Sequence, residues 1–367
     1  AFLSVWISWK FYSPIGGLVR IMKSEEGAEG NTSEEKSLSE MEYISNTYLS
    51  VIKDSKVLKQ QHRDNWRFLK KEFLKNLLNG HTHFYKNISK KLEEMEVDLD
   101  LRYFRVLVFR IDDYWTVFSK AYSEEDASLM LFAISNVAQE IISGKYKNEA
   151  VEMGDDVVAV IMNTCCNTED ESDDIVTLLV GQVQEAAGKH LGIGLSAGIG
   201  PCTEEPDDIC RSYKTAVEIS DYRLIFGKRS IIFPEMTERN LNMEYSYSEE
   251  TQKEILDQLR LKNYANISDK IGKFFAMLKL LSFSDIIMSI QRLIYESVKT
   301  LNSMANSKNY SYSYNNFQNE FKEMDTLDEI RDWMLDLFRQ AVDDLNSGQQ
   351  AGYKSVKVDY IERTLAI

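Results

Sequence analysis

Few side chains in this sequence form a pattern typical of a catalytic or metal-binding site. His81 and His83 form a His-x-His pair just after a predicted helix end. A metal site would need further His, Cys or carboxylate ligands, which the sequence does not mark. Cys165 and Cys166 are adjacent and could be redox-active, but nothing nearby is basic enough to lower a thiol pKa. Loop histidines and strand-end thiols are therefore the favoured interpretations.

Glycines and tyrosines form two further patterns. The glycines between Gly192 and Gly200 lie within a predicted strand. A dinucleotide fingerprint needs them at a strand-to-helix turn, so this pattern does not indicate one. Tyr310, Tyr312 and Tyr314 alternate in a polar run and could stack nucleotide bases. Almost no basic charge accompanies them, which favours a solvated loop.

An acidic turn joins two predicted strands in the middle of the chain. Asn148 to Met153 and Val157 to Met162 have strand patterns, and the tight polar turn Gly154-Asp155-Asp156 separates them. The strand Tyr103 to Ile111 precedes them and is dense in β-branched and aromatic residues. The hairpin and this strand must therefore belong to one sheet or to neighbouring sheets.

The elements around this hairpin alternate in a recognisable order. Amphipathic or buried patterns predict helices at 124–143, 175–191 and 206–226, and strands at 191–200 and 230–233. The order β, α, β, β, α, β, α, β predicts a ferredoxin-like core with a trailing helix and strand. The chain as a whole is predicted to be α+β, with a long N-terminal helix, this α/β domain and an all-α C-terminal connector.

The domain at 101–236 resembles a GGDEF domain, the fold of diguanylate cyclases. The hairpin Met153-Gly154-Asp155-Asp156-Val157 falls where that family carries its Gly-Gly-Asp/Glu-Glu-Phe signature. The run 195–200 resembles the family's following strand. The phrases Ser212-Tyr213-Lys214-Thr215-Ala216, Tyr222-Arg223 and Phe226-Gly227-Lys228 resemble its last helix and the turn after it.

The resemblance implies that the catalytic signature is degenerate. Cyclases of this family hold metal with an acidic residue on the first strand and another in the hairpin. The first-strand position is Arg110, a cation where a divalent metal needs an anionic oxygen. Met153 replaces the first glycine, Asp155 retains an acidic ligand position, and Asp156 replaces the catalytic Glu.

Further family positions also depart from the pattern. The Asn that reads guanine has no counterpart in 115–118, and the inhibitory Arg-x-x-Asp is absent from 144–147. Asp112 and Asp113 are interpreted as a helix cap. We therefore expect a non-catalytic domain with no catalytic residue, metal, cofactor or small-molecule substrate. Two alternatives stay open: nucleotide binding without turnover, or a weakly active cyclase that uses Asp155 and Asp156.

A long helix is predicted at 33–80, with Gly80 as its stop. Its residues at alternating spacings of three and four form a heptad seam: Met41, Ile44, Tyr48, Val51, Ser55, Leu58, His62, Asn65 and Leu69. The polar residues in its lower half suit a dimeric signalling helix that changes register, so a homodimer through 33–79 is expected. A single helix packed on its own domain is the alternative.

Both ends of the chain suggest neighbouring segments. The apolar run at the start, followed by Lys10, Arg20 and Lys23, is interpreted as the tail of a transmembrane helix at 1–13 with a juxtamembrane linker at 14–32. A stray apolar arm is the alternative. Residues 245–347 have helical stripes and form the predicted connector, and 353–367 resemble the first helix of an AraC-type helix-turn-helix domain.

This architecture resembles membrane-anchored AraC-type transcription regulators that carry a degenerate GGDEF-like domain. The resemblance implies DNA binding through a helix-turn-helix domain mostly beyond residue 367, and a location at the cytoplasmic face of the cell membrane. The 43 basic and 58 acidic residues give a net charge of −15, which argues against these residues as the main nucleic-acid contact. Four cysteines are too few for a disulfide framework and indicate reduced, cytosolic surroundings.

Overall fold

A computed structural model describes residues 65–82, 87–116, 124–164, 169–238, 249–304 and 323–347, together with residues 53, 56, 60, 317, 320 and 321. The predicted membrane tail at 1–13, the linker at 14–32 and the start of a helix-turn-helix domain at 353–367 lie outside these residues. Within them, none of the helices combines the length and the apolar character needed to cross a bilayer. The second of two compact units of the chain begins at Phe73.

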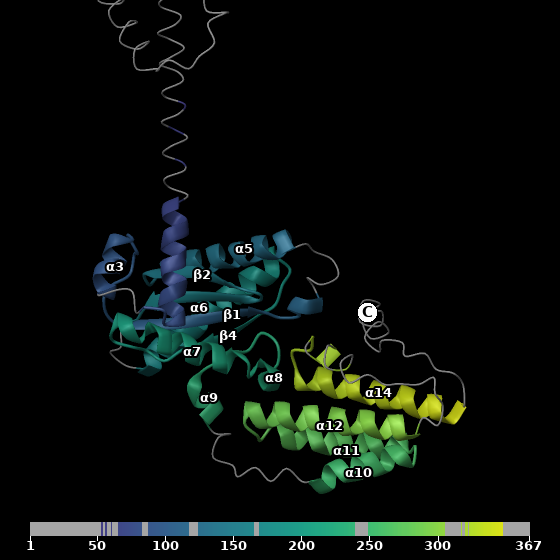
Figure 1. Ribbon diagram of the computed structural model, residues 1–367. Coiled ribbons are helices and arrows are strands. Elements are labelled where there is room, and N and C mark those ends of the chain that lie inside the picture. Colours follow the sequence, from purple (N-terminus) through teal and green to yellow (C-terminus); the bar gives the residue numbers. More distant parts are fainter. Residues whose placement is uncertain are drawn as a thin grey trace, which may run out of the picture. The chain divides into compact units, whose positions relative to one another are not determined.

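A five-stranded sheet forms the centre of the α/β domain (Figure 1). Its strands are β1 (Phe104–Ile111), β2 (Asn148–Gly154), β3 (Val157–Asn163), β4 (Leu195–Ile199) and β5 (Ile231–Ile232). The spatial order is β2-β3-β1-β4-β5. The first four strands pair antiparallel, and β5 pairs parallel with β4. This is the predicted ferredoxin-like arrangement with a trailing strand.

The central strand β1 is buried on both faces because its side chains alternate between two hydrophobic clusters. Leu107 and Phe109 pack on the face covered by α5 (Glu124–Ser143) and α6 (Glu169–His190). Val106 and Val108 pack on the opposite face, against α7 (Ile209–Ser220). Burial on both faces explains why residues 106–109 of β1 are an unbroken apolar run, with Arg105 and Arg110 on either side of it.

The second face of the sheet also receives the end of the long N-terminal helix, whose described part spans 65–79. Phe73, Leu74, Leu77 and Leu78 are buried there, together with residues of α3 (Ile88–Glu94). Gly80 has φ +76° and ends the helix, as predicted. A Cβ at position 80 would lie 2.7 Å from Sγ of Cys210, so the helix end lies close to the start of α7.

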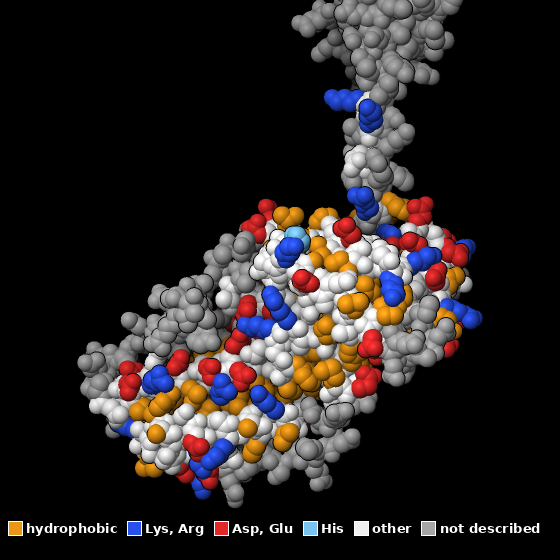
Figure 2. Space-filling view, turned by 180° about the vertical axis from the view of Figure 1, so that it is seen from behind, with side chains coloured by type: hydrophobic (Ala, Val, Ile, Leu, Met, Phe, Trp, Pro, Cys, Tyr) orange, Lys and Arg blue, Asp and Glu red, His pale blue; other side chains and the backbone are white. Residues whose placement is uncertain are grey.

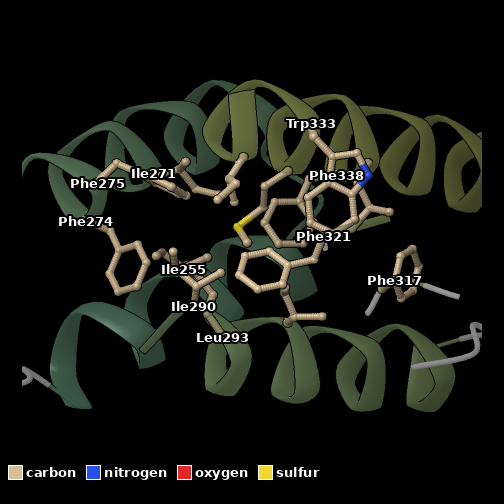
Figure 3. Packing of buried hydrophobic residues seen from close by; sticks show 14 of the residues in the cluster. Ile255, Ile271, Phe274, Phe275, Ile290, Leu293, Phe317, Phe321, Trp333 and Phe338 are labelled. Carbon is tan, nitrogen blue, oxygen red and sulfur yellow. The ribbon is translucent and has the colours of Figure 1, made fainter. Parts of the chain in front are cut away.

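A separate hydrophobic core holds together the C-terminal helices α10 (Glu249–Arg260), α11 (Tyr264–Leu278), α12 (Phe283–Met304) and α14 (Leu327–Ser347). These helices run alongside one another in Figure 1. Figure 3 shows aliphatic and aromatic side chains meeting in their core, including Ile255, Ile290, Trp333 and Phe338. The predicted all-α connector is therefore a bundle with its own core.

Several boundaries differ from those predicted. Helix α6 begins at Glu169, six residues before the first residue of its apolar stripe, Ile175, because acidic residues in a first helical turn are favoured by the helix dipole. Strand β4 begins only at Leu195, since Gly192 has φ +70° and interrupts the extended backbone. The helical run predicted at 206–226 divides into a 3-10 turn at Pro206–Asp208, α7 and α8 (Arg223–Phe226).

Two short helices were not predicted. Helix α3 follows Asn87, whose side chain accepts a hydrogen bond from the backbone N–H of Lys90. Helix α9 (Pro234–Glu238) begins at a proline, a residue suited to the first turn of a helix. Both helices are too short to show a hydrophobic stripe, which explains why periodicity missed them.

Candidate functional site

The hairpin that corresponds to the cyclase signature is a tight turn between β2 and β3. Gly154 pairs with Val157, so Asp155 and Asp156 form the turn. Gly154 and Asp155 have φ values of +107° and +47°, which glycine and aspartate tolerate better than most residues. Asp155 is exposed. Met153 is half-buried and packs against the cluster that contains the end of the N-terminal helix.

Arg110 reaches this hairpin from the end of β1. Its backbone is paired with Val157 on one side and Ser196 on the other. Its Nη1 lies 3.3 Å from Oδ1 of Asp156. On the other side of the guanidinium, Nη2 lies 2.9 Å from Oδ1 of Asp221, and Nε donates to Oγ of Ser220 at 2.8 Å. The Arg110 side chain is therefore held between the hairpin and the end of α7.

Asp156 lies between two guanidinium groups. Besides Arg110, Nη2 of Arg223 lies 3.3 Å from its Oδ2. Residue Asp156 is only 8% exposed, so these ion pairs are shielded from solvent. The carboxylate that replaces the catalytic Glu of the resembled family is thus paired with two cations of the same chain.

Asp112 has a different role from the predicted helix cap. Its Oδ1 accepts from Oγ of Ser196 at 2.6 Å, and its Oδ2 accepts from the backbone N–H of Arg229 at 3.0 Å. It thereby ties the end of β1 to β4 and to the segment before β5. Burial raises the pKa of the Asp112 carboxyl, although these hydrogen bonds and Arg223 act in the opposite direction.

A second set of charges surrounds Asp113. Its Oδ1 lies 2.6 Å from Nζ of Lys228, and its backbone N–H donates to Oδ2 of Asp325 at 2.6 Å. Lys228 also pairs with Glu329. Burial by itself would lower the Lys228 pKa, but the bonds to Asp113 and Glu329 raise it above its ordinary value. The predicted cap residue therefore contacts the C-terminal helical bundle instead.

Sequence reasoning assigned no role to several residues of this site, among them Asp221, Arg223, Lys228 and Asp325. Arg223 and Lys228 lie in segments that resemble the family, but their role depends on partners far away in the chain. Asp325 lies two residues before α14. A buried Asp directly before an amphipathic helix could have been noticed as a capping candidate, but not as a partner of Arg223.

The arrangement does not fit a divalent metal ion at the hairpin. Such an ion needs several anionic oxygens, whereas the guanidinium of Arg110 lies beside Asp156, the buried carboxylate of the turn. Among the described residues, no group of three or more His, Cys, Asp or Glu side chains is arranged to hold a metal. The charges instead neutralise one another and connect strands, turns and helices.

Other predicted candidates are placed only in part. His81 is described, but His83, Cys165, Cys166 and the alternating tyrosines at 310–314 lie outside the described residues. Cys210 is a free thiol, and Cys202 is disulfide-bonded. The disulfide differs from the expected reduced state of the cysteines, which rested on their number alone.

The region has recognisable relatives. Residues 81–221 match the family described as "GGDEF-like domain". The chain is 24% identical over 268 residues to a Bacillus subtilis (strain 168) protein named "Uncharacterized HTH-type transcriptional regulator YtdP". The match covers 70% of this chain but only 33% of that relative, so the chain spans a third of its length.

Two solved structures are also similar at 14% identity and a TM-score of 0.30 each. One is the active GGEEF domain of a diguanylate cyclase from Vibrio cholerae, with 40% of this chain and 88% of that chain covered. The other is diguanylate cyclase SiaD in complex with its activator SiaC from Pseudomonas aeruginosa, with 63% and 86% covered. This chain contains a GGDEF-like domain, and a TM-score of 0.30 supports no inference about activity.

Proposed function

We propose that this chain is the signal-relay part of a membrane-linked, AraC-type DNA-binding transcription regulator, and that its GGDEF-like domain is non-catalytic. The observation that carries the proposal is the pairing of Arg110 with Asp156 and Asp221. A cyclase must hold divalent metal and the phosphates of GTP at this hairpin. The sequence resemblance aligns Arg110 with the metal position, and the pairing of its guanidinium with the hairpin carboxylate of Asp156 supports the loss of that site.

Packing supports a relay role for the domain. Phe73, Leu74, Leu77 and Leu78 at the end of the N-terminal helix share one buried cluster with Val151 and Ala159 of the hairpin strands. Met153 and Val157, on either side of the turn, pack against the same cluster. Because close-packed interiors have low compressibility and transmit strain, a shift of this helix would displace the hairpin strands.

The DNA-binding part of the proposal draws on the relative named as an HTH-type regulator. The chain itself has a net charge of −15. The face in Figure 2 mixes basic and acidic side chains, with hydrophobic ones exposed between them. A phosphate backbone is bound by continuous basic surface, so we assign DNA contact to a domain beyond residue 367. The membrane link rests on the sequence of residues 1–13.

Incubation of the chain with GTP and Mg²⁺, followed by mass spectrometry of the products, tests whether the GGDEF-like domain is non-catalytic. We expect no cyclic dinucleotide, while an active diguanylate cyclase assayed in parallel yields it. Calorimetry with GTP is expected to give no binding heat. Product formation would overturn the proposal in favour of a cyclase, and binding heat without product would favour a nucleotide receiver.

DNA capture tests the regulator assignment. Genomic fragments are incubated with the natural full-length protein and, separately, with this 367-residue chain. We expect the full-length protein to enrich a few discrete sites and the chain to enrich none. Absence of enrichment by the full-length protein would contradict a DNA-binding regulator, and enrichment by the chain alone would contradict the location of the DNA-binding domain.

A further inference from the structure

The GGDEF-like domain and the helical bundle are joined through ion pairs, of which the Arg223–Asp325 pair is shielded from solvent. Two basic residues of the domain, Arg223 and Lys228, face two acidic residues of the bundle, Asp325 and Glu329. These four residues are called the clasp below. Surface ion pairs contribute little to stability, but the Arg223–Asp325 pair is shielded, with side chains 13% and 8% exposed. The Lys228–Glu329 pair is more accessible to solvent.

Arg223 contacts the hairpin and the bundle with the same atom. Its Nη2 lies 2.9 Å from Oδ1 of Asp325 and 3.3 Å from Oδ2 of Asp156. Its Nη1 donates to the backbone oxygen of Ile111 at 3.0 Å, which fixes the guanidinium at the end of β1. The side chain is 13% exposed. A displacement of Asp156 therefore changes the position or the charge balance of the group that holds Asp325.

Asp325 fixes the start of α14 in turn. Its two carboxylate oxygens accept from different donors, Oδ1 from Arg223 and Oδ2 from the backbone N–H of Asp113 at 2.6 Å. Its own backbone N–H donates to Oε2 of Glu329 at 3.0 Å, and Oγ1 of Thr326 accepts from the Glu329 N–H at 3.2 Å. These bonds satisfy groups in the first turn of α14, so the helix begins at the clasp.

Apolar side chains around Arg223 also pack against the bundle. Leu224 of α8 belongs to the hydrophobic core of the bundle, and Ile225 packs against it. The ring of Tyr222 lies 5.8 Å, between centroids, from that of Phe283 at the start of α12. Helix α8 therefore packs on the bundle core, and Ile225 also packs against the small cluster of Ile219, Tyr222 and Ile232 in the sheet domain. Arg223 lies between these two groups of apolar contacts.

We propose that the clasp couples the degenerate hairpin to helix α14, so that a change at Asp156 is passed through Arg223 and Asp325 to the chain that follows residue 347. This inference rests on the proposed relay function and names the contact that performs it. Breaking one partner of a shielded ion pair leaves an uncompensated charge. The clasp therefore favours two discrete arrangements, closed or open, and disfavours intermediate ones.

Hydrogen exchange followed by mass spectrometry tests the clasp in the full 367-residue chain. The variant is Asp325→Asn. The carboxylate accepts hydrogen bonds with both oxygens, whereas an amide has only one oxygen, so its NH₂ group must face one of the two donors. The matched control is Asp269→Asn on α11, which removes an equal charge from an exposed pair with Lys273.

We expect Asp325→Asn to accelerate exchange about tenfold or more both in α14 and in the hairpin of β2 and β3. The substitution removes the charged partner of Arg223, which also contacts Asp156 of the hairpin. Helices α5 and α6, on the opposite face of the sheet, should change much less. The control should alter only α11. Acceleration confined to α14, or equal acceleration in every segment, would overturn the proposal.

If Asp325→Asn does not fold, Glu329→Gln at the Lys228 side of the clasp is measured with the same expected pattern and the same contrary outcomes. The measurement uses no DNA, membrane or nucleotide. A negative result for the coupling would therefore leave the proposed function, a non-catalytic part of a regulator, unaffected. Equally, the coupling can hold even if DNA capture contradicts the proposed function.

Discussion

Gly198 of β4 lies directly against the backbone of Ala216 in α7, where a Cβ on residue 198 would approach the Ala216 oxygen to 2.2 Å. The same Cβ would lie 2.9 Å from Cβ of Ser220. Contacts this short do not occur in folded proteins, so glycine is required for α7 to pack so closely. This packing matters for the site, because Ser220 and Asp221 at the end of α7 hold the guanidinium of Arg110.

Substitution Gly198→Ala should therefore destabilise the domain by about 1–3 kcal/mol or more, since the helix must move away from the strand. Urea unfolding monitored by circular dichroism measures the change. The control is Gly181→Ala within α6, where an added Cβ meets nothing within 4 Å. It should be neutral or stabilise by about 0.5–1 kcal/mol, because alanine favours helix more than glycine does. Equal stability of the two variants would contradict the close packing.

Substitution Arg110→Met should destabilise the fold by about 1–3 kcal/mol at neutral pH, because Asp221 and Asp156 lose a charged hydrogen-bond partner. Burial already raises the pKa of Asp221, and Arg110 acts in the opposite direction. The comparison variant is Arg260→Met, whose exposed pair with Asp257 should contribute less than about 1 kcal/mol. Chemical denaturation measures the free energy of unfolding of both variants. An Arg110→Met protein more stable than the unmodified chain would contradict the pairing role of Arg110.

Stability should fall as the pH rises through the range in which Asp325 loses its proton. Burial raises the pKa of Asp325 from 3.8 to about 6, although Arg223 and the Asp113 N–H act in the opposite direction. The carboxylates of Asp113 and Asp112 also face it and raise the pKa. The folded state therefore binds the proton more tightly than the unfolded state between these values. The resulting stabilisation is complete below pH 3.8 and is lost as the pH rises through about 6.

The loss due to Asp325 is on the order of 3 kcal/mol at most. The free energy of unfolding is measured at pH 4.5 and at pH 7. Asp325→Asn should show a smaller decrease between the two than the unmodified chain, whereas Asp328→Asn, at an exposed site in the same helix, should behave like the unmodified chain. If the free energy of unfolding falls as much in Asp325→Asn as in the unmodified chain, the Asp325 carboxyl is not the cause of the pH dependence.

Self-association is predicted through the heptad seam of residues 33–79. Leu69 lies on that seam and is 50% exposed in the single chain. Replacement by Glu would bury a charge in a dimer interface, so we expect Leu69→Glu to raise the dimer dissociation constant about tenfold or more. Sedimentation equilibrium of the 367-residue chain measures it. Arg67→Gln changes the net charge equally and should leave association unaltered. A monomeric unmodified chain at high concentration would rule out the dimer.

Local pattern was sufficient to predict the strands and the main helices of the domain. Strands β1, β2 and β3 and helix α5 follow the predicted ranges within a residue or two. Short runs dense in β-branched and aromatic residues, and the apolar stripe of α5, are visible in a local window of the sequence. Gly80 ends the N-terminal helix for an equally local reason, its positive φ. Helix α3 is a miss of the same method, since seven residues do not display a stripe.

From the sequence alone we could predict a GGDEF-like hairpin with Asp155 and Asp156, and an arginine, Arg110, at the position of an acidic residue in the resembled family. The partners of these charged groups became visible only in the folded chain. Arg110 and Asp156 are brought together by the pairing of β1 with β3, and Asp113 contacts Asp325, 212 residues further along the chain. Such contacts depend on how two separately formed cores pack together. No short-range periodicity encodes that packing, so a buried Asp in the bundle could not be recognised in advance as the partner of an arginine in the sheet domain.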